Sequence, residues 1–171
     1  MKLKPNALLR AVCVAVAFLP LICVPAEGEP STCESLAKFK LAHGEINSAQ
    51  AVAAGPLTVT GFMGTKEISV PAFCRVLATL RPTADSDIKI EVWLPASGWN
   101  GRLEAVGNGG LAGSIVEEAM VGALWAGYAT AGTDTGHKGG PATGDWAFGH
   151  PEKIADFGWR AIHRAHADVY H

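Results

Sequence analysis

Alternating apolar and polar positions in the middle of the chain predict a pair of β-strands. Residues 74–81 (CRVLATLR) and 88–94 (IKIEVWL) both alternate with the period of two that is typical of strands. The apolar side chains of the second segment share one face: Ile88, Ile90, Val92 and Leu94. The six residues between the two segments, PTADSD, are turn formers. The pattern therefore predicts an antiparallel hairpin.

The pattern before this hairpin is weaker. Residues 57–70 alternate only in part and contain Gly61 and Gly64, which indicates an irregular pair of strands. Ser35 to Leu41 can form one short helix, and the rest of residues 27–56 has no clear period.

The pattern after the hairpin alternates between strands and helices. Residues 102–106 predict a third strand that runs directly into Gly107–Gly110, and residues 128–133 predict a short buried strand. A helix is expected between them over residues 115–125, with Ile115, Ala119, Gly122 and Leu124 near one face. Pro151 begins a long C-terminal helix, whose apolar positions include Phe157, Ala161 and Ala165. This order predicts an α/β sheet that becomes parallel after its first hairpin, and about four strands indicate the front part of a larger domain.

The first 26 residues have the pattern of an export signal. Lys2, Lys4 and Arg10 precede an uncharged apolar run over residues 11–24, and small residues follow it. We therefore expect a signal peptide over residues 1–26 and a mature chain over 27–171 that is secreted or periplasmic, with no membrane contact after cleavage. An uncleaved anchor, or a lipoprotein through Cys23, remains an alternative.

Charge and cysteine content change once this signal is removed. The whole chain has a net charge of −2, and the mature chain has 11 basic and 16 acidic residues, or −5, because the signal contains three basic residues. Such a charge excludes an electrostatic footprint for nucleic acid. Cys33 and Cys74 remain, and two cysteines in an exported chain predict one disulfide, worth about 3–4 kcal/mol in the chain-entropy description. Two buried free thiols are the alternative.

The glycine cluster Gly107–Gly110 allows three interpretations. Glycines between a strand and a helix let backbone N–H groups point at one anion, either a phosphate or the oxyanion of an acyl-transfer intermediate. Gly107-x-Gly109-x-x-Ala112, with Asp134 after the next strand, fits a dinucleotide-binding fingerprint. The same loop fits the oxyanion loop of an α/β-hydrolase. A tight turn without a function is the third interpretation.

The histidines and serines are less specific. Asp134 and His137 could orient one another, although a turn stabilised by the Asp134 carboxylate is favoured. His163 and His166 have a helical i, i+3 spacing, but no third ligand has a suitable spacing, so no metal is expected and a solvated face is favoured. The serine nucleophile motif G-x-S-x-G does not occur in the sequence. The five tryptophans could line an aromatic-substrate pocket, although most tryptophans are simply packed.

Seven short sequence motifs, taken together, resemble those of one family. They are Phe73-Cys-Arg-Val76, Ile90-x-Val92-x-Leu94-Pro95, Trp99-Asn-Gly101, Val106-Gly-Asn-Gly-Gly110, Gly127-Tyr-Ala129, Asp134-Thr-Gly-His137 and Pro151-Glu-Lys153. In this order and at this spacing they resemble the tannase/feruloyl esterase family over about residues 33–165.

The resemblance implies a secreted serine carboxylesterase of α/β-hydrolase fold that cleaves esters of aromatic acids such as gallic or ferulic acid. It implies that Cys33–Cys74 is the family's N-terminal disulfide, and that Gly109 or Gly110 supplies one oxyanion-hole N–H. The family's serine word, its later Asp and His and its lid with a calcium site do not occur in this sequence, so no cofactor is expected here. Neither His137 nor His163 is expected to be the triad histidine, because that residue follows the serine in this fold.

We therefore expect the N-terminal part of such an esterase, inactive by itself, whose substrate in the whole enzyme is a small aromatic ester. Two alternatives remain. One is an exported, non-catalytic binding module that keeps the front half of the fold. The other is a dinucleotide-binding oxidoreductase.

Overall fold

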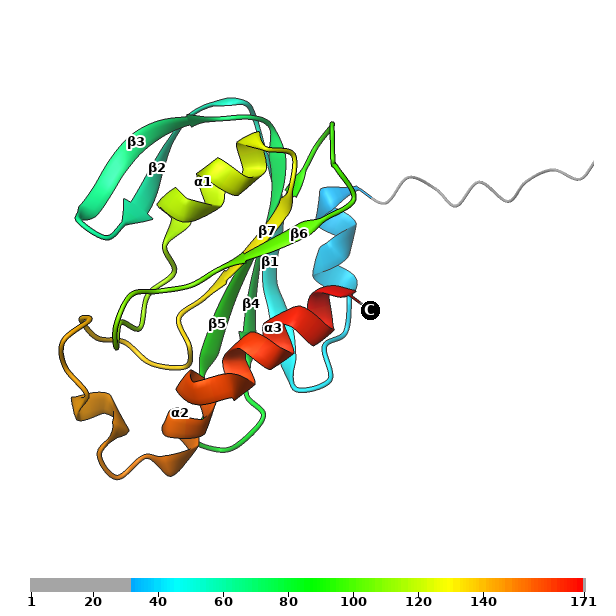
Figure 1. Cartoon of the computed structure of the whole chain (residues 1–171). Helices are drawn as coiled ribbons and strands as arrows, with labels where there is room; N and C mark the ends of the chain where they lie inside the picture. The colour runs from blue at the N-terminus through cyan, green and yellow to red at the C-terminus, as the bar shows by residue number, and fades with distance from the viewer. Residues whose placement is uncertain (1–31, 171) are drawn as a thin grey trace, which may run out of the picture. The chain divides into compact units, whose positions relative to one another are not determined.

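The computed structural model describes residues 32–170, with side chains as far as residue 167. Five strands form one sheet in the order β1-β4-β5-β7-β6 (Figure 1). Their bounds are β1 Gly44–Val52, β4 Phe73–Leu80, β5 Ile88–Pro95, β6 Leu103–Val106 and β7 Ala129–Thr133. A second sheet holds only the hairpin of β2 (Gly55–Gly61) and β3 (Gly64–Val70), which confirms the strand pair expected over residues 57–70.

The expected central hairpin is confirmed. β4 and β5 pair antiparallel, with Val76 opposite Val92 and Ala78 opposite Ile90. The predicted face of β5 is also confirmed, because Ile88, Ile90 and Val92 are buried together in one core.

The sheet is less parallel than the expected alternation of strands and helices indicates. β6 and β7 are parallel and are joined through α1 (Glu117–Trp125), as expected for a crossover. However, β7 also pairs with β5, and that pairing is antiparallel, as are β1–β4 and β4–β5. The described fold is therefore mixed α/β with a mostly antiparallel sheet.

Strand β1 has no counterpart among the expected elements. Its sequence, GEINSAQAV, has too few apolar residues to show a period of two. It pairs along its whole length with the edge of β4, with an irregularity between Ile46 and Ser48. Pairing with a neighbour that is already fixed, rather than local propensity, explains this strand.

The two faces of the large sheet carry different layers. On one face, α1 and the β2–β3 hairpin pack on Phe73 and Trp93 (Figure 1). On the other face, the 3₁₀ helix η1 (Cys33–Lys38) and α3 (Ala161–Tyr170) cover Val76, Ile90 and their neighbours. The predicted disulfide between Cys33 and Cys74 is confirmed and joins η1 to β4 on this second face.

The helix that begins at Pro151 is interrupted by a wider turn. It consists of α2 (Pro151–Ala155), a π-helical turn η3 (Asp156–Arg160) and α3. Asp156 is fully buried, and its carboxylate accepts a hydrogen bond from Arg160 at 2.8 Å. Among the described residues, no helix is long and apolar enough to cross a bilayer. The expected signal peptide, residues 1–26, lies outside the described residues.

Candidate oxyanion loop

The glycine cluster lies where β6 ends. β6 stops at Val106, and Gly107–Gly110 then turn the chain toward α1. Gly110 has φ +57°, and a Cβ at this position would lie 2.6 Å from the carbonyl oxygen of Pro141. The loop therefore requires glycine at position 110 for two reasons, its backbone conformation and its close contact with the facing loop.

The amides of Gly109 and Gly110 are not used in holding this loop. Within residues 32–170, neither N–H donates a hydrogen bond to another group. The turn is closed instead by the N–H of Ala112, which donates to the carbonyl of Gly109 at 3.1 Å. Two adjacent backbone donors at the carboxyl end of a strand can stabilise an anion such as an oxyanion.

A second loop, which follows β7, holds residues 107–113, here called the glycine loop, in place. Leu111 N–H donates to Pro141 O at 2.9 Å, and Gly113 N–H donates to Gly139 O at 3.1 Å. From the glycine loop, the side-chain amide of Asn108 donates to Ala112 O. The two loops are therefore one unit, although more than 20 residues separate them in the sequence.

Asp134 and His137 do not orient one another. The Asp134 carboxylate accepts hydrogen bonds from Lys89 N–H and Gly136 N–H, each at 2.9 Å, as the turn interpretation requires. Burial raises the pKa of this carboxyl group, against the opposing effect of its backbone hydrogen bonds. The His137 ring points elsewhere, and its Nε2 lies 3.0 Å from Leu111 O.

The tip of the β2–β3 hairpin reaches the glycine loop. A Cβ on Gly109 would lie 3.2 Å from the Phe62 ring, so the hairpin tip and the loop are in contact. The Phe62 side chain is 67% exposed, so an apolar ring beside Gly109 remains open to solvent. This contact could not be predicted, because Gly61 and Gly64 indicate an irregular pair of strands but not what the tip of that pair contacts.

A buried ion-pair cluster ties the hairpin and α1 to the sheet. Arg75 lies between Glu91, at 2.6 Å, and Glu117. Trp93 Nε1–H donates to Glu91 at 2.6 Å, and Thr60 N–H donates to Glu117 at 2.6 Å. Burial raises the pKa of Glu91, while Arg75 acts in the opposite direction. Glu91, a charged residue within the strand IKIEVWL, is the feature of the sequence that could have indicated this cluster.

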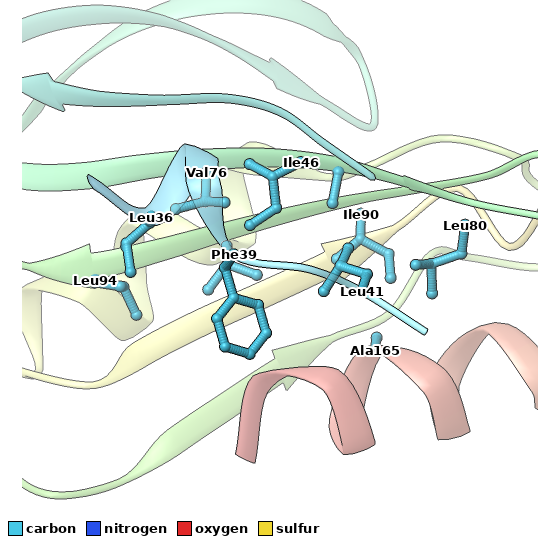
Figure 2. A pocket seen from close by; sticks show the side chains of 11 residues that line it. Leu36, Phe39, Leu41, Ile46, Val76, Leu80, Ile90, Leu94 and Ala165 are labelled. Carbon is cyan, nitrogen blue, oxygen red and sulfur yellow. The ribbon is translucent and has the colours of Figure 1, made fainter. Parts of the chain in front are cut away.

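Two hollows differ in polarity. A polar one of about 380 Å³ adjoins the glycine loop and includes Ser114, Asp134 and Lys138. An apolar groove of about 210 Å³ lies on the other face of the sheet, between η1 and α3 (Figure 2). Figure 2 shows its lining by Leu36, Phe39 and Ile46, with Ala165 on the opposite wall. This groove offers no polar side chain for chemistry, so the polar hollow is the better candidate for a substrate.

The remaining candidates are dispersed. His163 and His166 are exposed on α3, and no group of three or more possible metal ligands occurs among the described residues. Trp93 is fully buried and Trp146 packs against His137, whereas Trp99, Trp125 and Trp159 are mostly exposed. The tryptophans therefore do not line one shared pocket.

Comparisons with known proteins agree with the resemblance. The family described as tannase and feruloyl esterase matches residues 74–169. An uncharacterized esterase of Xanthomonas campestris is 42% identical over 132 residues, which cover 77% of this chain and 23% of that protein. A probable feruloyl esterase B-1 of Aspergillus fumigatus is 39% identical over 105 residues, or 61% of this chain and 19% of that protein.

Solved structures give the same result. The crystal structure of feruloyl esterase B from Aspergillus oryzae matches with a TM-score of 0.68 and 33% identity, over 78% of this chain and 26% of that chain. An esterase from the same species matches with the same TM-score at 30% identity. The chain thus spans about a quarter of the length of these relatives.

Proposed function

Because the chain belongs to the tannase and feruloyl esterase family, we propose that it forms the front part of a carboxylic ester hydrolase that acts on esters of aromatic acids. Feruloyl esterases among the relatives support this class of substrate. The fold in this proposal is that of an α/β-hydrolase, which the antiparallel hairpin and the helix-linked parallel strands β6 and β7 support.

One observation carries the proposal. The loop after β6 presents the amides of Gly109 and Gly110, which donate to no group of the described residues, while the rest of the loop is held firmly. In an α/β-hydrolase one oxyanion donor comes from this position, and the residue after the nucleophile supplies the other. The mechanism is then attack by serine, stabilisation of the tetrahedral oxyanion, and hydrolysis of the acyl-enzyme.

The nucleophile in this proposal lies outside the 171 residues, since they contain no G-x-S-x-G word. These residues contribute the scaffold, the disulfide and half of the oxyanion hole. We further propose that the protein is exported, and that the lid and its calcium site belong to the part of the enzyme outside this sequence.

The test starts with the nucleotide sequence beyond the His171 codon and the protein that its complete reading frame encodes. We expect that protein to hydrolyse methyl ferulate or methyl gallate, and the 171-residue chain to be inactive alone. Gly110→Val in the complete protein is expected to lower kcat by about 100-fold or more. The control is Gly122→Ala, on the exposed side of α1, where an added Cβ meets nothing within 4 Å.

Two results would contradict the proposal. One is an active 171-residue chain whose turnover is lost on Gly110→Val and absent from a mock preparation. The other is a stop codon directly after His171, which would favour the non-catalytic binding module. The dinucleotide alternative is not favoured, because the chain belongs to the tannase and feruloyl esterase family.

A further inference from the structure

Among residues 32–170, His137 is the one side chain of the loop after β7 that bonds directly to the backbone of the glycine loop. Its Nε2 lies 3.0 Å from the carbonyl oxygen of Leu111, the residue that follows Gly110. The N–H of Leu111 donates to Pro141 O at 2.9 Å. The C=O of Leu111 shares a peptide unit with the N–H of Ala112, which donates to Gly109 O at 3.1 Å. Because the C=O of Gly109 in turn shares a peptide unit with the N–H of Gly110, the His137 contact is linked to the Gly110 amide through one peptide unit and one hydrogen bond.

The partner atom determines where the proton of the ring lies. A carbonyl oxygen only accepts, so His137 Nε2 must carry the hydrogen and donate it. The other ring nitrogen, Nδ1, faces the hydroxyl of Thr135 at 3.5 Å. That hydroxyl donates its hydrogen to Asp134 O at 2.7 Å, so it is not a donor to Nδ1, and the Leu111 carbonyl is the contact that determines the tautomer.

The ring itself is fixed by packing. His137 is 5% exposed and stacks on Trp146 with ring centroids 3.8 Å apart, and Phe157 lies edge-on at 5.6 Å. These contacts come from two further segments, η2 (Asp145–Ala147) and the helix after Pro151. Because the donor ring is held in one orientation, it restricts the position of the Leu111 carbonyl more tightly than a mobile side chain would.

The contact between the two loops is close. A Cβ on Gly113 would collide with the backbone and ring of His137, so the glycine loop lies directly against this residue. The turn that aims His137 is itself fixed, because the Asp134 carboxylate bonds to Gly136 N–H at 2.9 Å.

We propose that His137 is a positioning residue for the oxyanion hole, one that fixes Leu111 O and thereby, through Ala112 N–H and Gly109 O, the direction of the Gly110 amide. This inference rests on the proposed function of the loop. His137 touches neither substrate nor nucleophile in this role. Its loss lowers the stabilisation of the transition state, and so kcat, more than it weakens substrate binding.

Two variants separate the donor from the packing. His137→Gln keeps an N–H donor near the position of Nε2 but loses the aromatic stack, whereas His137→Phe keeps the stack and loses the donor. In the complete esterase we expect His137→Phe to lower kcat by about 10- to 100-fold with KM nearly unchanged, and His137→Gln to restore most of kcat. His163→Gln, an exposed histidine on α3, is the matched control and should leave both constants unchanged.

A second measurement does not depend on catalysis. Long-range ¹H–¹⁵N spectra of the wild-type protein should show a hydrogen on Nε2 of His137 that exchanges slowly with solvent. If the wild type hydrolyses no ester, the proposed function fails while this spectrum still reports the contact with Leu111.

The inference is overturned if His137→Phe retains kcat, since packing alone then explains the residue. It is also overturned if His137→Gln loses as much kcat as His137→Phe, since an N–H donor then does not restore activity. Should His137→Phe fail to fold, the spectrum decides: protonation at Nδ1 overturns the inference, and protonation at Nε2 supports it.

Discussion

The two faces of the large sheet are built on different principles. The face beneath α1 buries charge: Arg75, Glu91 and Glu117 meet there, and two backbone or indole donors complete the cluster. The core beneath α3 is made of apolar side chains, apart from the buried Asp156–Arg160 pair in the turn before this helix, and it leaves a groove of about 210 Å³ (Figure 2). The glycine loop leads directly into α1, the helix of the polar face. Directional bonds fix positions, and apolar burial adds stability without fixing them.

The largest expected effect comes from removing Arg75. Arg75→Ala leaves the buried carboxylates of Glu91 and Glu117 without their cation, which is expected to lower the free energy of unfolding by about 3–5 kcal/mol. Urea unfolding of the purified protein measures this loss. The matched control is Arg81→Ala, whose pairs with Glu45 and Asp87 are exposed and should contribute less than about 1 kcal/mol. Equal losses of unfolding free energy in the two variants would show that the buried ion pairs of Arg75 stabilise the protein no more than the exposed ion pairs of Arg81.

The next effect belongs to the apolar face. Replacing Cys33 and Cys74 with serine opens a loop of 41 residues and is expected to cost about 3–4 kcal/mol. Thermal unfolding with and without reductant checks this value. The comparison predicts that the ester-hydrolysing activity of the complete protein survives below the lowered Tm, because the disulfide lies on the face away from α1. Loss of activity at temperatures where the double variant is folded would show that the disulfide and the glycine loop are not independent.

These two faces also differ in how far the sequence predicts them. The apolar face follows from the period of two in IKIEVWL, and the disulfide follows from two remaining cysteines. The position of α1 does not follow from its pattern. Ala119 and Gly122, expected on its inner side, are exposed, and Met120, Val121 and Glu117 are buried instead. Glu117 turns inward because Arg75 lies beneath it. The pattern of apolar residues within the helix cannot predict this contact, because Arg75 lies 42 residues away in the sequence.

The candidate site shows the same limit. Its glycines could be predicted, because a glycine cluster after a strand has few structural uses. The residues that hold them could not be predicted. The side chains of Asn108 and His137 donate to the backbone carbonyls of Ala112 and Leu111, and backbone carbonyls leave no mark in the sequence. Pro141 acts through its own carbonyl, for the same reason unpredictable. The role of Gly109 and Gly110 in catalysis stays a prediction.

A smaller effect compares the space on the two faces. Ala78→Val adds carbon to the apolar groove and is expected to stabilise the protein by about 0.5–1 kcal/mol. Gly132→Ala adds carbon beneath α1, where its Cβ would lie 2.9 Å from Ile115 and 3.3 Å from Met120, and should destabilise by about 1–3 kcal/mol. Opposite signs in urea unfolding would support the contrast, and two stabilising substitutions would show that the polar face is also underpacked.

The smallest expected effect is a pH dependence with opposite signs at two carboxyl groups. Burial raises the pKa of Glu91 above its ordinary value of 4.5. Between 4.5 and the raised pKa, the folded protein keeps a proton that the unfolded chain has released, so stability falls as pH rises through this window. At the surface, the hydrogen bond from Lys89 lowers the pKa of Asp87, so its contribution is lost as pH falls below 3.8. Unfolding free energies measured against pH should lose the first slope in Glu91→Gln and the second in Asp87→Asn. A slope in the first window that survives Glu91→Gln would belong to another group, such as the buried carboxyl of Asp134, whose pKa burial also raises.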